Sequence, residues 1–339
     1  MFGVMGSLSG VVSFLFSLIG VVVGFISVSM LGVWVGMELS FLSVICFGSG
    51  SSTEETESMM KYFIIQVMGS CVCAMGFLMV VNMFEIMLGQ FLIMIGMIMK
   101  LGVFPFHFWV GPVVSKLSWG GCVAILLLQK LIPLWVFSNY ILFFKDVNRI
   151  EFLCCMTSLV GCLGGLNVLN YRVLLGFSSV QNLGSMVLLS CCHEFYLWMF
   201  IVVYFILSGF LMMSLWVLGV YGFQDLVKEK SPKSFDNFWW VSLYFLSSAG
   251  IPPFVGCAMK VALIYGCWNY MPLGTGFCVL TSCISLVFYL GVILSVVIFW
   301  GKSSSLSKVY YGFSNSKVSV LSLLVNLAGG FLIYLVLSL

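Results

Sequence analysis

Apolar runs of about 20 residues recur along the whole chain, and they constrain its fold more than any other feature. An α-helix rises about 1.5 Å per residue, so a run of this length crosses the roughly 30 Å hydrocarbon core of a bilayer. Hydrophobic residues make up 62% of the 339 residues and charged residues only 7%, so a soluble globule would lack polar surface. The sequence therefore predicts an all-α polytopic membrane protein.

The apolar runs predict about eleven transmembrane helices joined by short connections. The longest connections follow Val220 and Lys302, and neither has room for a soluble domain. The expected spans are 8–28, 30–48, 59–83, 86–110, 121–144, 151–168, 173–191, 195–219, 239–268, 276–300 and 318–338.

Basic residues in the connections predict the orientation, because loops on the inner side of a membrane are enriched in lysine and arginine. The side of the N-terminus carries Lys116, Arg172, Lys228, Lys230, Lys233, Lys302, Lys308 and Lys317. The opposite side carries Lys145 and Arg149, so the N-terminus is expected on the inner side. The net charge of +3 forms no patch, which excludes nucleic acid as a partner.

Prolines interrupt two of the expected helices. Pro105 lies within the fourth span, and Pro252 and Pro253 lie within the ninth. Proline lacks an amide hydrogen and its ring clashes with the preceding turn, so helices four and nine are expected to be broken. They are five helices apart and therefore run in opposite directions, which is typical of inverted repeats. We expect a first five-helix repeat at 1–148, a second at 149–301, and a final loop with one extra helix at 302–339.

Four ionisable side chains lie deep within the expected spans: Glu38, Lys100, Lys130 and Lys260. Charge at this depth is costly, so such residues usually face a partner, water or a transport path. Counting along the helices puts Glu38 and Lys130 about 12 to 14 Å below the membrane surface. Lysines repel metal cations, and hard cations need several oxygen ligands. The four residues therefore predict a path for protons.

Burial favours the neutral forms of a glutamate and a lysine, whereas a neighbouring opposite charge favours the charged forms. A pair of Glu38 and Lys100 would be poised between these states. Our hypothesis is that forming or breaking this pair changes the proton affinity of Lys130, which then exchanges a proton with Lys260.

Other polar residues have two interpretations each. His107 either satisfies backbone groups freed by Pro105 or carries protons. Ser178, Ser179, Gln181 and Asn182 form a polar patch that either holds water or makes hydrogen bonds between helices. Lys61, Lys116 and Lys145 lie near span ends and are expected to reach the headgroups.

Thirteen cysteines lie within apolar runs, and the sequence has no Cys-x-x-Cys pair accompanied by a second ligand cluster. They are expected to act as small buried hydrophobes. The sequence also lacks a nucleotide-binding loop. We therefore expect no metal or cofactor on this chain, and an energy source on another protein.

Several segments resemble the antiporter-like subunits of respiratory complex I, and within them the subunit 2 group of NADH dehydrogenases. They follow the family's order over residues 30–265. The segments are Trp34-Val-Gly-Met-Glu38, Met60-Lys61-Tyr62-Phe63-Ile-Ile-Gln66, KLGVFPFHFWV from Lys100, Leu128-Gln129-Lys130-Leu-Ile-Pro133, Gly164-Gly165-Leu166-Asn167, Gly176-Phe177-Ser178-Ser179 and GIPPFVG from Gly250.

The resemblance implies a proton-translocating membrane-arm subunit of NADH:ubiquinone oxidoreductase in the mitochondrial inner membrane, with its N-terminus in the matrix. It implies that quinone reduction elsewhere in the complex drives transport. NADH, flavin, iron-sulfur clusters and ubiquinone would then bind other subunits. Partners would be neighbouring antiporter-like subunits, small membrane subunits and lipids, cardiolipin among them.

The resemblance also implies roles for individual residues. Glu38 matches the family's glutamate of helix two, Lys100 the lysine of the broken helix, Lys130 the central lysine and Lys260 the lysine after the second break. The chain departs from the family at three positions. A basic residue is common in the family where this chain has Val173, a histidine where it has Asn182, and a proline where it has Met259. Two alternatives from other classes are a stand-alone cation/proton antiporter and a non-pumping structural spacer of the complex.

Overall fold

The computed structural model describes residues 8–50, 52–83, 85–141, 147–223, 225, 233–252, 254–304, 326 and 328–330. All regular elements in this part of the chain are helices, and the one β-bridge recorded there joins Asn170 to Gly222. Seven helical segments within the described residues are long and apolar enough to cross a membrane, one of them the continuous segment Trp119–Asn139. The expected class, an all-α polytopic membrane protein, is confirmed.

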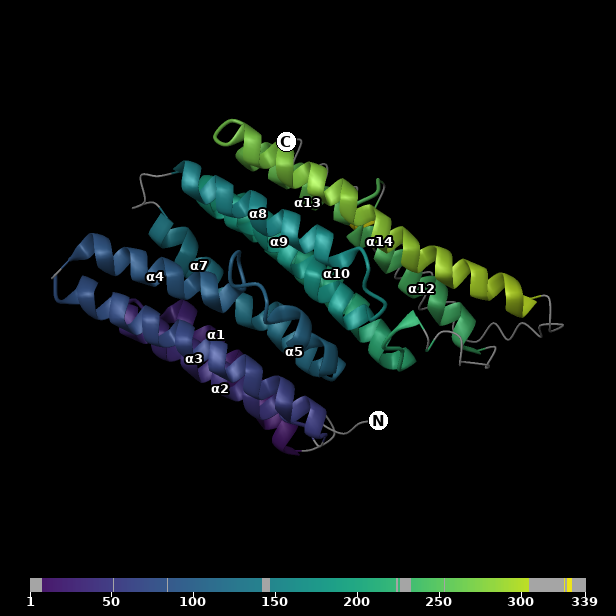
Figure 1. The fold of residues 1–339 in the computed structure, drawn as a ribbon, viewed down its shortest axis with the longest axis horizontal. Helices are drawn as coiled ribbons and strands as arrows, with labels where there is room; N and C mark the ends of the chain where they lie inside the picture. The colour runs from purple at the N-terminus through teal and green to yellow at the C-terminus, as the bar shows by residue number, and fades with distance from the viewer. Residues whose placement is uncertain are drawn as a thin grey trace.

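The helices before residue 142 form one side of the molecule in Figure 1. They are α1 (Leu8–Ile26), α2 (Met30–Gly48), α3 (Thr53–Val81), α4 (Ile86–Leu101), α5 (Val110–Lys116), α6 (Trp119–Val123), the π-helix η1 (Ala124–Leu128) and α7 (Gln129–Ile141). Helices on the other side are α8 (Val147–Gly165), α9 (Tyr171–Cys192), α10 (Glu194–Leu218), α12 (Lys233–Ser248), α13 (Gly256–Cys267) and α14 (Pro272–Ser304).

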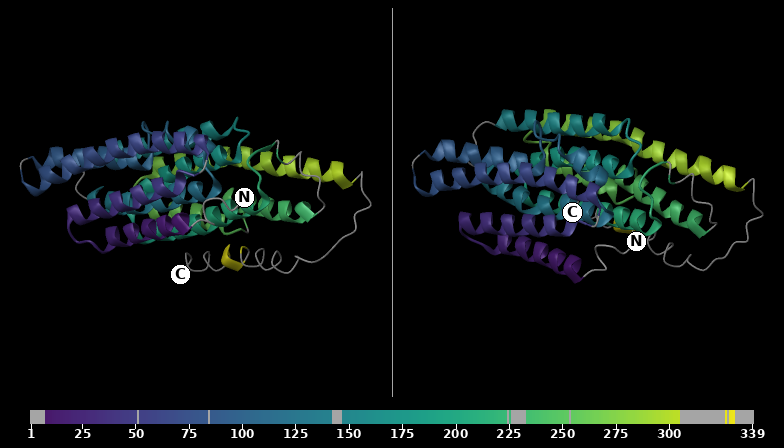
Figure 2. Two further views of the ribbon diagram at one scale, coloured as in Figure 1. Left: turned by 90° about the horizontal axis from the view of Figure 1, so that it is seen from below. Right: turned by 60° about the horizontal axis from the view of Figure 1, so that its bottom comes forward.

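The helices run roughly parallel or antiparallel in an elongated bundle (Figures 1 and 2). The connected ends of α3 and α4 extend furthest at one end of the bundle, and α14 extends furthest at the other (Figure 2). The expected eleventh span, 318–338, lies outside the described residues except at Asn326 and 328–330.

Glycine allows two helix pairs to approach closely. A Cβ atom at Gly36 of α2 would meet the backbone of Gly24 in α1, and one at Gly161 of α8 would meet the backbone of Gln181 in α9. Small residues commonly permit such backbone contact in membranes. Gly36 and Gly161 therefore let these two helix pairs pack closely.

Each proline-containing stretch lies between two helices. α4 ends at Leu101, where Gly102 takes a left-handed conformation with φ 77°, and α5 begins after the turns that contain Pro105. The amides of Gly102 and Val103 both donate to the Ile98 carbonyl, which is a common way to end a helix.

The second stretch has a similar helix end. α12 ends at Ser248 and α13 begins at Gly256. Between them Gly250 has φ 71°, and its amide donates to the Ser247 carbonyl at 2.9 Å. Pro252 lies in this connection, whereas Pro253 lies outside the described residues. Each connection is therefore close to a lysine, Lys100 before the first and Lys260 after the second.

Candidate functional site

Glu38 and Lys100 form an ion pair between α2 and α4. Lys100 Nζ donates to Glu38 Oε1 at 2.9 Å, and the two side chains are 5% and 20% exposed, respectively. Lys100 lies in the last turn of α4, where the helix dipole favours a cation. Removing either partner would leave the charge of the other without compensation in a largely buried place, which is costly.

Lys130 lies at the start of α7, directly after η1 and three residues before Pro133. Its Nζ donates to the backbone carbonyl of Ser179 in α9 at 3.3 Å. The side chain is buried, and no carboxylate in the described part of the chain forms an ion pair with it. Lys130 thus connects the helices of the first half to α9 through a neutral acceptor.

Lys260 in α13 also bonds to a backbone carbonyl. Its Nζ donates to Ala249 O at 2.8 Å, in the connection that precedes α13. Lys260 lines a cavity of about 40 Å³, which exceeds the volume that one water molecule needs. Polar groups that line the same cavity are Gln181, Asn182, Ser185, Ser248, Ser282, Ser285 and Tyr289.

The four charged residues form one direct contact among themselves in the described part of the chain, that of Glu38 with Lys100. Polar groups of α9 lie next to the other two. The carbonyl of Ser179 accepts from Lys130, and Asn182, three residues later on the same helix, lines the cavity of Lys260.

Three other predicted residues have local partners. The imidazole of His107 is stacked against the ring of Phe104 and tilted against that of Phe108, with centroids 6.1 and 4.1 Å away. Its Nδ1 is buried and has no hydrogen-bond partner among the described residues. Ser178 and Ser179 donate to the carbonyls of Leu175 and Gly176 within α9. None of these ring contacts or hydrogen bonds joins His107, Ser178 or Ser179 to Glu38 or Lys100.

Some polar residues of the site are absent from the candidate residues expected from the sequence. Ser282, Ser285 and Tyr289 recur at helical spacing along α14 and line the cavity of Lys260. This spacing places them on one helix face, so a search for polar stripes within apolar runs would have found them.

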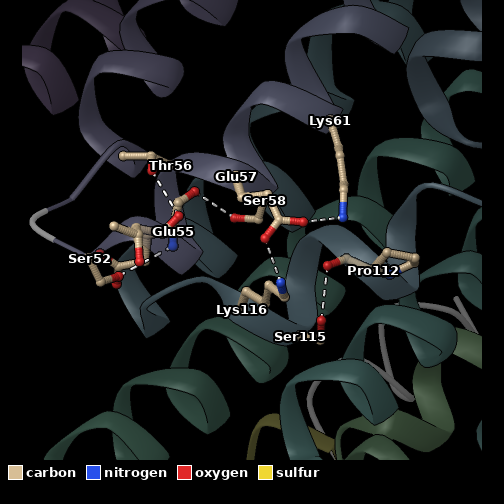
Figure 3. Close-up of polar contacts among 10 residues, drawn as sticks. Ser52, Glu55, Thr56, Glu57, Ser58, Lys61, Pro112, Ser115 and Lys116 are labelled. Atoms are coloured by element: carbon tan, nitrogen blue, oxygen red, sulfur yellow. Dashed lines mark hydrogen bonds and ion pairs between the residues drawn. The ribbon is translucent and has the colours of Figure 1, made fainter.

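A second ionic cluster joins α3 to α5 (Figure 3). Glu57 accepts from Lys116 at 2.8 Å and from Lys61 at 2.6 Å. The 29 residues of α3 span about 44 Å, more than a bilayer core requires, and the expected span begins at residue 59. Glu57 is 51% exposed and lies outside that span. Lys61 and Lys116, both expected to reach the headgroups, share this carboxylate.

We expect the α3–α5 cluster to weaken in acid. Lys116 and then Lys61 lower the pKa of Glu57 from 4.5 to about 2. Because this pKa is depressed in the folded chain, the stabilisation is present above about pH 4.5 and is lost as the pH falls toward 2. E57Q should therefore flatten the pH dependence of the melting temperature in this window. Melting in detergent measures this. E85Q is the control, because Glu85 is an exposed residue before α4 that forms no ion pair among the described residues. Identical profiles for E57Q and wild type would contradict the prediction.

The fold and these charges define a polytopic helical membrane protein that carries ionisable side chains inside its helix bundle. Residues 27–285 match the family described as NADH:quinone oxidoreductase/Mrp antiporter, TM. NADH-ubiquinone oxidoreductase chain 2 of Anopheles gambiae is 30% identical over 320 residues, which cover 91% of each chain. The chain of the same name from Lumbricus terrestris is 30% identical over 274 residues, covering 79% of this chain and 81% of that one.

Solved structures share the fold. A chain of respiratory complex I from Thermus thermophilus with bound Aureothin has a TM-score of 0.81 at 18% identity, covering 98% of this chain and 80% of that one. A chain of an archaeal membrane-bound sulfane sulfur reductase has a TM-score of 0.80 at 16% identity, covering 96% and 73%. The chain belongs to the NADH:quinone oxidoreductase/Mrp antiporter membrane family, in its NADH-ubiquinone oxidoreductase chain 2 group.

Proposed function

We propose that this chain is a proton-translocating membrane-arm subunit of an NADH:ubiquinone oxidoreductase. The observation that carries the proposal is the ion pair of a half-buried Glu38 with a buried Lys100, together with a separate buried lysine, Lys130, whose hydrogen-bond partner among the described residues is a backbone carbonyl. An ion pair that forms and breaks can change the electric field at a nearby amine, and with it the proton affinity of that amine, without a metal or a cofactor. The redox assembly in this proposal is the one named for the chain's family and relatives, NADH-ubiquinone oxidoreductase.

In the proposed cycle, Glu38 and Lys100 cancel each other's charge while they are paired. Separation of the pair exposes the Lys100 cation, which repels a proton on Lys130. α9 offers a route onward, because its Ser179 carbonyl contacts Lys130 and its Asn182 lines the cavity of Lys260. Lys260 then holds the proton until the pair forms again. The energy comes from quinone reduction on other subunits.

We also propose the finer architecture expected from the sequence: eleven spans, with broken helices four and nine, in inverted repeats at 1–148 and 149–301 and a further segment at 302–339. Its support is the similarity of the two connections. Each follows a helix that ends near a glycine with positive φ, Gly102 or Gly250, and each lies beside a buried or half-buried lysine. Broken helices at corresponding places in two repeats commonly line transport sites.

The proposed location is the mitochondrial inner membrane, with the N-terminus in the matrix. Proposed partners are neighbouring antiporter-like subunits, small membrane subunits and lipids, including cardiolipin. Under this proposal NADH, flavin, iron-sulfur clusters and ubiquinone bind elsewhere, and this chain performs no redox chemistry. Its relatives named NADH-ubiquinone oxidoreductase chain 2 favour this assignment.

Purification under native conditions tests the proposal against a stand-alone antiporter. We expect the chain to co-purify with NADH:ubiquinone oxidoreductase activity and to translocate protons in liposomes only when NADH and quinone are supplied. A pH-sensitive dye enclosed in the liposomes measures the proton flux, and an added uncoupler gives the baseline for no net flux. A chain that purifies alone and exchanges Na⁺ or K⁺ for protons without NADH would overturn the proposal.

A further inference from the structure

Two cysteines from different helices contact each other through their thiols. Cys192 is the last residue of α9, and Cys267 is the last residue of α13. Their side chains form a hydrogen bond with each other, and both thiols are free. A disulfide requires its two sulfur atoms in close apposition, and two thiols that already touch meet the main part of this requirement.

Contacts other than the thiols hold these two helix ends together. A Cβ atom at Gly266, next to Cys267, would lie only 2.8 Å from the side chain of Leu189 in α9. Beyond α13 the amide of Tyr270 donates to the carbonyl of Cys267 at 3.1 Å. The ring of Tyr270 lies 5.3 Å from that of His193, the residue directly after α9. The backbone is therefore fixed on both sides of the thiol pair.

Cys192 is the more accessible of the two thiols. Its side chain is half-buried and the next residue, His193, is exposed, whereas Cys267 is fully buried. Oxidation of cysteine follows its exposure, and the first oxidation product is reversible when a second thiol lies beside it to form a disulfide. An oxidant therefore reaches Cys192 first, and Cys267 is in place to react with the product.

The neighbouring thiol of Cys191 has a different partner. Its Sγ donates to the Val187 carbonyl within α9 at 3.3 Å, so the contact with Cys267 belongs to Cys192. In the described part of the chain, no group of three or more His, Cys, Asp or Glu side chains is arranged to hold a metal ion. The contact between the thiols therefore favours disulfide chemistry over metal binding.

We propose that Cys192 and Cys267 form a site of reversible oxidation, at which hydrogen peroxide converts the two thiols to a disulfide between α9 and α13. The inference goes beyond the proposed function and does not depend on it. The bond would join two walls of the Lys260 cavity, because α9 contributes Asn182 to its lining and α13 contributes Lys260.

The oxidation takes place in two steps. The Cys192 sulfur attacks one oxygen of the peroxide, the O–O bond breaks, and a sulfenic acid forms while the thiol proton leaves with the other oxygen as water. The Cys267 sulfur then attacks the Cys192 sulfur, so the S–S bond forms, the S–O bond breaks and a second water leaves. In sum the two thiols lose two hydrogen atoms, and the peroxide is reduced to two waters. A dithiol reductant reverses the change by thiol–disulfide exchange.

Mass spectrometry of the assembled complex tests this site. The complex is treated with hydrogen peroxide, its free thiols are alkylated, and the chain is digested with and without dithiothreitol. We expect a linked pair of peptides that contain Cys192 and Cys267 and that together weigh two hydrogen atoms less than the separate peptides. Alkylation of both thiols should be lost and should return after dithiothreitol. The matched control is C191S, which should still form the link, whereas C192S and C267S should not.

Several outcomes would overturn the proposal. One is that both thiols remain open to alkylation after peroxide treatment. Another is a link that persists in C192S, because the bond would then belong to Cys191. Oxidation of Cys192 to a sulfinic or sulfonic acid without a link to Cys267 also contradicts it. If a serine variant fails to assemble, fragmentation of the linked wild-type peptides decides: a bond assigned to Cys192 supports the site, and one assigned to Cys191 overturns it.

Discussion

Replacing Lys130 with methionine should lower NADH-driven proton translocation by the assembled complex about a hundredfold, at the lower end of what a positioned proton carrier contributes. Methionine matches the length of the buried stem and adapts to irregular packing, so the helices should remain in place. What the variant removes is the amine that bonds to Ser179 O and, in the proposed cycle, receives the proton.

The rate of proton uptake into proteoliposomes measures this effect, and native gels measure assembly. K61M is the matched control, since Lys61 is 49% exposed and forms its ion pair outside the proposed path. K61M should pump at the wild-type rate. Unchanged pumping per NADH in an assembled K130M complex would mean that the chain is a structural spacer and transports nothing.

Much of the fold could be predicted because a bilayer restricts the backbone conformations that a spanning segment can adopt. Backbone groups in hydrocarbon must be satisfied within the segment, so an apolar run of sufficient length becomes a helix. The runs expected at 8–28 and 30–48 correspond to α1 (Leu8–Ile26) and α2 (Met30–Gly48). Helix ends were harder to predict, as at Thr53, where α3 begins six residues before the expected span because Ser52 caps it.

The charged members of the site could also be predicted, because a lone Glu38 or Lys130 in an apolar run stands out. Their partners could not. Ser179 and Ala249 contribute backbone carbonyls, which every residue has, so only the packing of α9 and the connection before α13 reveals them. The Nε2 of Gln129 has no hydrogen-bond partner among the described residues, which is equally invisible in the sequence because it depends on how the surrounding helices pack.

Removing one member of the Glu38–Lys100 pair should destabilise the subunit more than removing both. E38Q leaves the Lys100 ammonium buried without its carboxylate, at a cost of about 3 kcal/mol, the lower end for a broken buried pair because Glu38 is partly exposed. K100M in the E38Q background removes that charge, and an apolar pair of similar volume should restore most of the stability. Thermal melting of the assembled membrane arm compares the wild type, both single variants and the double variant.

Proton translocation by the double variant then distinguishes a structural pair from a working one. If the pair only holds α2 against α4, E38Q/K100M should regain translocation together with stability. In the proposed cycle translocation stays lost, because no charge separates to act on Lys130 even though the helices pack as before. A stable double variant that pumps at the wild-type rate would therefore limit Glu38 and Lys100 to a structural role. A stable one that does not pump would tie transport to the opening of this ion pair.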